Sequence, residues 1–149
     1  MTRRMVLGAL REKLLAEMED IEAQLHSLQD SLHAETKSSA GDKHETGRAM
    51  IHQEMRQVND TLTRAQHALR ELTRMQDEEV QPERVAPGVL VATDGPWVLV
   101  GIALGKTAWK GQMVLGVSPQ APLAQAWHGA EVGDEVAMGP KTWTIKALL

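Results

Sequence analysis

The chain has 149 residues, a net charge of −4 and no cysteine. Its shares of apolar residues (42%) and charged residues (24%) are typical of a folded protein with one or two small domains. The acidic balance argues against direct binding of duplex DNA, which requires a basic surface. The lack of cysteine excludes disulfides and thiolate chemistry. The apolar run Met5–Leu10 is too short for a signal peptide, and no stretch approaches the roughly 20 apolar residues of a membrane span, so we expect a cytoplasmic protein without a membrane partner.

Residues 1–80 predict two long helices, because apolar residues recur there every three or four positions in two runs. This spacing is typical of the seam of a coiled coil. Small residues at Ser38–Gly41 separate the runs and favour a reversal of the chain. We therefore expect an antiparallel hairpin with arms of roughly 45 Å; the alternative is an intermolecular bundle. The seam consists of Leu14, Met18, Ile21, Leu25, Leu28 and Leu32 in the first run and Ile51, Met55, Val58, Leu62, Ala65, Leu69 and Leu72 in the second.

Residues 81–87 contain two prolines and predict a linker, after which residues 88–149 predict a small domain of strands with one short helix. Both faces of the segment 97–103 are apolar, which indicates a central strand. The whole chain is thus expected to be α+β, with the order β-β-β-α-β-β in the second domain. The expected strands are Val89–Thr93, Trp97–Ala103, Gln112–Val117, Glu135–Met138 and Thr142–Ala147, and the expected helix is Leu123–His128. We also expect Trp97, Trp109, Trp127 and Trp143 to supply much of the core.

Two acids, Asp42 and Glu45, follow the expected turn at a spacing of three residues, which places them on one face of the second helix. One interpretation is helix capping, with Asp42 as the N-cap residue and Glu45 as its partner in a capping box. The other is that the two carboxylates bind a metal ion or take part in catalysis. The interpretations are compatible, because a capping carboxylate keeps a free oxygen.

The motif Gly41-Asp42-x-x-Glu45 at the end of a helical hairpin resembles the tip of the Gre transcript-cleavage factors. A second motif, with the same order of features as the C-terminal Gre domain, begins about 75 residues later. It consists of Val117-Ser118-Pro119, the proline-led segment 122–126, Gly129 and Val132-Gly133-Asp134. Together the motifs cover nearly the whole chain. The string 35–50 is similar to that of a Gre-like subgroup from Bacteroidetes.

The resemblance implies a coiled-coil hairpin, an FKBP-like C-terminal domain and a role as a transcription elongation factor. Such a factor binds bacterial RNA polymerase, reaches through its secondary channel and stimulates cleavage of backtracked nascent RNA at its 3′ end. The factor has no enzyme activity and no cofactor of its own, because the polymerase holds the catalytic Mg²⁺. By resemblance, Asp42 and Glu45 would complete the shell of a second Mg²⁺ and orient the attacking water. The resemblance also implies that the polymerase binds the C-terminal domain around Ser118, Pro119, Pro122, Leu123 and Gln125.

The chain departs from the Gre pattern directly after the acidic pair. The family has a further acid and an aromatic residue there, whereas this chain has Arg48 and Met50. Arg48 could pair with RNA phosphate or with Asp42 or Glu45. A non-cleaving regulator of the same channel is therefore an alternative function, and a coiled-coil adaptor for another protein is a third.

Two weaker candidates involve histidine and lysine. His44 and His52 are eight residues apart, which does not suit a zinc site on one helix. Four lysines in the second half are either solvated singly or form a small basic face for a partner. They are Lys106, Lys110, Lys141 and Lys146.

Overall fold

The computed structural model describes residues 2–37 and 42–149. The helices are α1 (Arg3–Lys37), α2 (Asp42–Asp77) and α3 (Pro122–Trp127), and the strands are β1 (Leu90–Thr93), β2 (Trp97–Val100), β3 (Gly105–Trp109), β4 (Gln112–Val117), β5 (Glu135–Met138) and β6 (Lys141–Leu148). They belong to two compact units: Glu12–Leu69, called here the hairpin unit, and Met1–Arg11 with Arg70–Leu149, called the sheet unit. The domain boundaries predicted at residues 80 and 87 are based on changes in composition, whereas the two units are defined by packing. The ends of both long helices therefore belong with the sheet.

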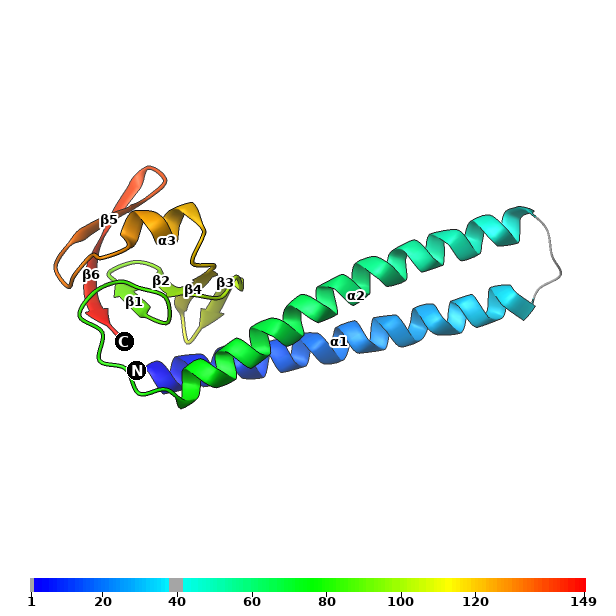
Figure 1. Cartoon of the computed structure of the whole chain (residues 1–149), viewed down its shortest axis with the longest axis horizontal. Coiled ribbons are helices and arrows are strands. Elements are labelled where there is room, and N and C mark those ends of the chain that lie inside the picture. Colours follow the sequence, from blue (N-terminus) through cyan, green and yellow to red (C-terminus); the bar gives the residue numbers. More distant parts are fainter. Residues whose placement is uncertain (1, 38–41) are drawn as a thin grey trace. The chain divides into compact units, whose positions relative to one another are not determined.

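The hairpin unit consists of two long antiparallel helical segments from one chain (Figure 1). Its predicted seam is confirmed, because the seam positions are buried or half-buried while most positions between them are exposed. Met18 on α1 and Val58 on α2 retain only 9% and 8% of their exposure. Burial of an apolar stripe every three to four residues is what stabilises long helices in water. The α+β class, with a helical hairpin and a β-rich remainder, is therefore confirmed.

The sheet unit contains a mixed six-stranded sheet in the order β3-β4-β2-β1-β6-β5. All neighbouring pairs are antiparallel except β2 and β4, which run parallel. The prediction that β2 is central is confirmed, since it pairs with β1 on one side and β4 on the other. The predicted turn at Lys110-Gly111 also occurs, with φ values of 48° and 78° that suit a tight hairpin turn.

The predicted count of five strands is wrong, because Gly105–Trp109 forms a separate strand, β3. This strand lies at the edge of the sheet and is mostly exposed, so its sequence lacks the apolar alternation that indicates a strand. The predicted strand 97–103 ends early, at Val100. Gly101 follows it with φ +131°, a conformation that L side chains rarely adopt and that turns the chain out of the sheet.

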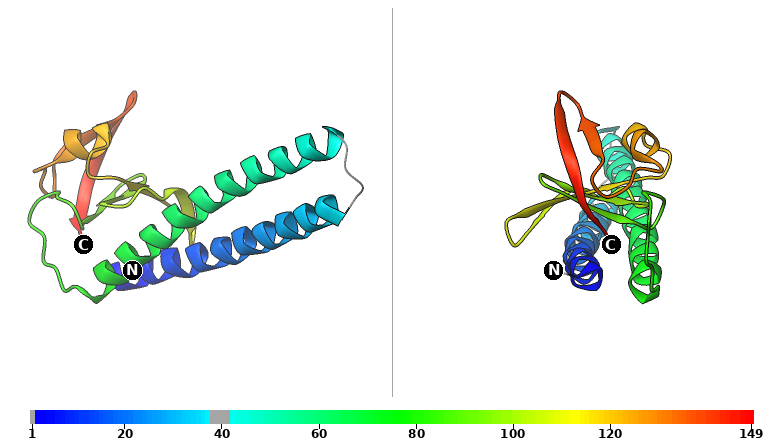
Figure 2. Two further views of the ribbon diagram at one scale, coloured as in Figure 1. Left: turned by 45° about the vertical axis from the view of Figure 1, so that its right-hand side comes forward. Right: turned by 90° about the vertical axis from the view of Figure 1, so that its left-hand side faces the viewer.

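Helix α3 covers one face of the sheet (Figures 1 and 2). Trp127 of α3 is 1% exposed, packs among buried valines and isoleucine, and donates a 2.8 Å hydrogen bond from its indole N–H to the carbonyl of Ala137. The expectation that all four tryptophans supply much of the core holds for Trp127 alone, because Trp97, Trp109 and Trp143 are only half-buried, although Trp143 packs against the core. Branched aliphatic side chains fill most of the space instead. The strand and loop residues of this core are Val85, Val89, Val91, Val98, Val100, Val136 and Ile145.

The other face of the sheet carries Leu90 and Leu99, which pair across β1 and β2 and are fully buried. The ends of α1 and α2 in the same unit bring further fully buried side chains, including Leu7 and Leu72. The methyl end of Met75 lies so close to Gly101 that a Cβ there would be 2.7 Å from it. The helix ends are thus part of the apolar core of the sheet unit.

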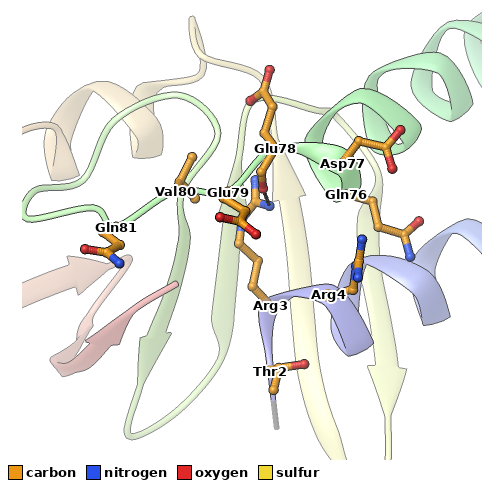
Figure 3. A pocket seen from close by; sticks show the side chains of 9 residues that line it. All are labelled: Thr2, Arg3, Arg4, Gln76, Asp77, Glu78, Glu79, Val80 and Gln81. Carbon is orange, nitrogen blue, oxygen red and sulfur yellow. Dashed lines mark hydrogen bonds between the residues drawn. The ribbon is translucent and has the colours of Figure 1, made fainter.

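Arg3 ties three segments of the sheet unit together, and Figure 3 shows its hydrogen bond to Glu78. Its guanidinium donates to the carbonyl oxygens of Met75 and Glu78 at the end of α2 and to that of Gly88 before β1. Burial lowers the pKa of Arg3 from its ordinary value, and the charge of Glu78 partly opposes this shift. In the parts of the chain that the structure describes, no helix is long and apolar enough to cross a membrane.

Candidate functional site

The candidate acidic site lies where α2 begins. Asp42 is the first residue of this helix, and Glu45 follows in the same first turn with an exposed side chain. A spacing of three residues places both positions on one face of the helix. The predicted turn at Ser38–Gly41 and the side chain of Asp42 lie outside the described residues. Whether Asp42 caps the helix therefore stays a prediction.

Glu35 of α1 approaches the same part of α2. A Cβ built on Gly47 would lie 3.3 Å from Oε2 of Glu35, so the glycine leaves room for this carboxylate beside the helix. Glu35 is half-buried and has a polar partner of its own. The sequence contained no spacing signal for this residue, because the approach of α1 to α2 brings it there. An acid from the first helix thus lies beside Gly47, which follows Glu45 by two residues in the chain.

Arg48 stands one helical turn after Glu45 and is half-buried. Residues three apart on a helix are neighbours on its surface, so Arg48 lies on the same side as the acidic pair. Its positive charge lowers the attraction of this surface for a cation. The site therefore combines the predicted acids with one basic residue. Where the Gre pattern has a further acid and an aromatic residue, this chain has Arg48 and Met50.

Carboxylate oxygens are the ligands that Mg²⁺ prefers, and an exposed Glu45 can offer one. Mg²⁺ takes about six oxygen ligands, so two carboxylates from one helical turn supply only a part of its shell. Among the side chains that the structure describes, which do not include those of residues 36–44, no three histidine or acidic groups converge as a metal site. By themselves, Asp42 and Glu45 can therefore supply only part of the ligand shell of a metal ion.

The predicted docking residues lie at the junction of β4 and α3. The carbonyl of Ser118 accepts a hydrogen bond from Ala121 N–H, and Pro122 then occupies the first turn of α3, where its missing N–H carries no cost. Leu123 is half-buried and packs against the core. These three residues therefore shape the junction.

Pro119 and Gln125 are brought together on the surface. They line a pocket of about 300 Å³ whose other walls include Pro87 and His128. Gln125 and His128 are exposed, and Pro119 is half-buried. Pro87 and His128 were not predicted, because only the fold brings the end of the linker beside α3. The junction thus offers a small, proline-lined surface with two polar side chains.

A second hollow, of about 380 Å³, surrounds the start of α1 and the end of α2 (Figure 3). Its walls carry three consecutive acids, Asp77, Glu78 and Glu79, and two arginines, Arg3 and Arg4. The guanidinium of Arg3 is used by backbone carbonyls, as described above. We therefore assign this hollow a structural role.

No protein-family model matches the chain, and no curated protein matches its sequence. The features of the chain that bear on function are therefore the hairpin, the acidic pair and the β4–α3 junction.

Proposed function

We propose that this chain is a transcription elongation factor that binds bacterial RNA polymerase, enters its secondary channel with the hairpin and stimulates cleavage of backtracked nascent RNA. The observation that carries the proposal is an antiparallel hairpin whose second helix begins with Asp42 and presents Glu45, exposed, in its first turn. The arms 12–37 and 42–69 of the hairpin unit are each roughly 40 Å long, and a single helix is only about 10–12 Å wide. Such a rod suits a narrow channel.

In this proposal the C-terminal docking surface at Pro119 and Gln125 grips the polymerase, and the acids reach the RNA 3′ end. A second Mg²⁺, bound beside the one that the polymerase already holds, would supply charge stabilisation at the attacked phosphate and an activated water. Asp42 and Glu45 would each give this ion one carboxylate oxygen and help to position the water. The polymerase supplies the remaining ligands, so the chain alone is inert towards RNA.

Glu35 supports the same reading by its charge. Its carboxylate lies against α2 at Gly47, near the first turn that carries Glu45. Negative charge beside a cation site raises the affinity for the cation even without direct ligation. Glu35 thus partly compensates for the acid that Arg48 replaces.

A non-cleaving regulator of the same channel is the second candidate, and Arg48 is the observation that favours it. Arg48 lies on the same face of α2 as Glu45 and is half-buried. An arginine so placed suits pairing with RNA phosphate. It would then hold the RNA without supporting a second metal ion.

The acidic pair can be tested with Asp42→Asn and Glu45→Gln in the full chain. Asparagine caps helices about as well as aspartate, and glutamine also serves in a capping box, so both variants should fold with a change of only ~0.3–1 kcal/mol from the helix dipole. We expect both to bind polymerase in a pull-down and to lose Mg²⁺-dependent cleavage of RNA in stalled, backtracked complexes. Arg48→Glu is the matched opposite change and should increase cleavage.

The outcomes separate the three functions. Cleavage at the wild-type level by both acid variants would leave the acids as caps without a part in cleavage. A wild-type chain that binds polymerase but does not stimulate cleavage would favour the regulator. Failure of the wild-type chain to retain polymerase in the pull-down would exclude both channel functions and favour the adaptor.

A further inference from the structure

Three tight turns of the sheet unit lie at the same end of the strands: the β1–β2 turn, the β3–β4 turn and the β5–β6 turn. Because β2 and β4 run parallel, the β1–β2 turn and the β3–β4 turn lie side by side at the starts of these strands. The start of β6 joins them, since Asp94 N–H donates to the carbonyl of Thr144 and Thr144 N–H donates to the Asp94 carboxylate at 2.9 Å. This end of the strands is opposite to the end at which β4 stops and Ser118 begins the docking junction.

A groove of about 460 Å³ runs between these turns. We call it the turn groove and define it by Pro96, Gln112, Met113, Met138, Lys141 and Trp143. Met113 is 47% exposed, a large value for an apolar side chain in so small a domain. Gln112 braces the groove by donating from its side-chain amide to the carbonyls of Gly95 and Met113, at 2.8 and 3.0 Å. The groove is therefore held open by hydrogen bonds and lined by apolar side chains that are accessible to a partner.

Trp143 forms a rigid wall of the groove. A Cβ on Gly95 would lie 2.4–2.7 Å from three consecutive atoms of the indole, so the backbone of the β1–β2 turn rests on a face of the ring. The ammonium group of Lys141 lies over the same ring, 5.9 Å from its centroid. The ring face that carries the turn backbone is therefore closed to a nucleic-acid base, since stacking requires an open ring face.

The rim of the turn groove is cationic. Lys141 lines it, and Lys110 stands on the adjacent β3–β4 turn with its ammonium group 5.0 Å from the centroid of Trp109. Asp94, an acid in the β1–β2 turn, accepts a hydrogen bond from the backbone N–H of Thr144 in β6 through one carboxylate oxygen. A partner that reaches the groove therefore meets two exposed lysines.

We propose that the turn groove binds an acidic segment of another protein. An apolar side chain of that segment packs against Met113, Met138 and Trp143, while its carboxylates pair with Lys110 and Lys141. Methionine adapts its shape to different apolar partners, and aromatic anchors beside charged rims are typical of interfaces between proteins. This inference does not depend on the proposed role in transcription, because the turn groove lies at the opposite end of the strands from the docking junction.

The test uses the full chain and short fluorescein-labelled peptides of about ten residues, close to the strand length that a groove of this kind can accommodate. In each peptide, glutamates flank a central pair of leucines, methionines or phenylalanines. One control peptide replaces the glutamates with lysines, a second replaces the central pair with serines, and a third probe is a single-stranded oligouridylate. Binding is followed by fluorescence anisotropy and by the NMR shifts of the methionine methyl groups and the indole N–H groups.

We expect at least one acidic peptide to bind with a dissociation constant below ~1 mM and to shift the signals of Met113, Met138 and Trp143. The double variant Lys110→Glu with Lys141→Glu should weaken binding about tenfold or more, and added salt should weaken it as well. Met113→Ser should weaken it several-fold. Lys146→Glu, the same charge change at a residue outside the groove, should leave it nearly unchanged.

Several results would overturn the proposal. They are no binding by any acidic peptide, equal binding by the lysine or serine controls, tighter binding of the oligouridylate, and unchanged binding by the double variant while circular dichroism shows it folded. Self-association of the wild-type chain that the double variant abolishes would also overturn it, because the occupant would then be a second copy.

Discussion

The hairpin unit and the sheet unit hold their side chains in different ways. Along the hairpin, burial is spread over a repeating seam in which many positions, such as Leu25 and Leu62, are only half-buried. In the sheet unit, burial is concentrated in side chains that are almost completely enclosed, such as Trp127 and Val98. A spread seam tolerates single changes, whereas an enclosed core does not. Single substitutions should therefore cost less stability along the hairpin than in the core of the sheet unit.

The largest expected effect is at Trp127. Trp127→Ala removes an enclosed indole and leaves the Ala137 carbonyl without its donor, so we expect a loss of about 3–5 kcal/mol in the free energy of unfolding. Leu25→Ala in the hairpin seam is the comparison and should cost only about 1 kcal/mol, since the side chain is half-buried. Chemical denaturation of both variants measures the contrast. Equal losses would show that the two units do not differ in this way.

The next effect concerns the helix ends that belong to the sheet unit. Arg3→Ala leaves the carbonyls of Met75, Glu78 and Gly88 without their donor, and we expect a loss of about 1–3 kcal/mol. Arg4→Ala, at the exposed neighbouring position, is the control and should change stability by less than about 0.5 kcal/mol. Thermal unfolding followed by circular dichroism distinguishes them. If the two variants have the same Tm, Arg3 does not anchor the helix ends.

The smallest effect is a gain at Gly8, where α1 lies beside α2. Gly8→Ala raises helix propensity by up to about 1 kcal/mol. Its new Cβ would lie 3.2 Å from the side-chain nitrogen of Gln76, which is the far end of a flexible side chain and can move by a few tenths of an ångström. We expect a net gain of about 0.5 kcal/mol. Gly88→Ala is the control and should be destabilising, because φ there is +94°. A loss at Gly8 would mean that the helices are too tightly packed at this point to accept a methyl group.

The sequence alone predicted the elements whose signals are local. The heptad spacing of Leu14–Leu32 and Ile51–Leu72 identified the hairpin, and the bounds predicted for β4 and β5 agree with the structure. For the candidate site, the sequence predicted that Asp42 and Glu45 share a helical turn, because positions three residues apart lie on the same face of a helix. These features depend only on residues close together in the chain.

Only the tertiary structure decided which residues meet from distant parts of the chain. It placed Glu35 beside Gly47, Pro87 beside Gln125, and three half-buried tryptophans outside the centre of the core. It also revealed the exposed strand β3 and the parallel pairing of β2 with β4, which brings three turns together as the turn groove. Local sequence patterns indicate which side chains are buried. Which neighbour buries each of them depends on strand order and register, and these are decided by the packing of the whole unit.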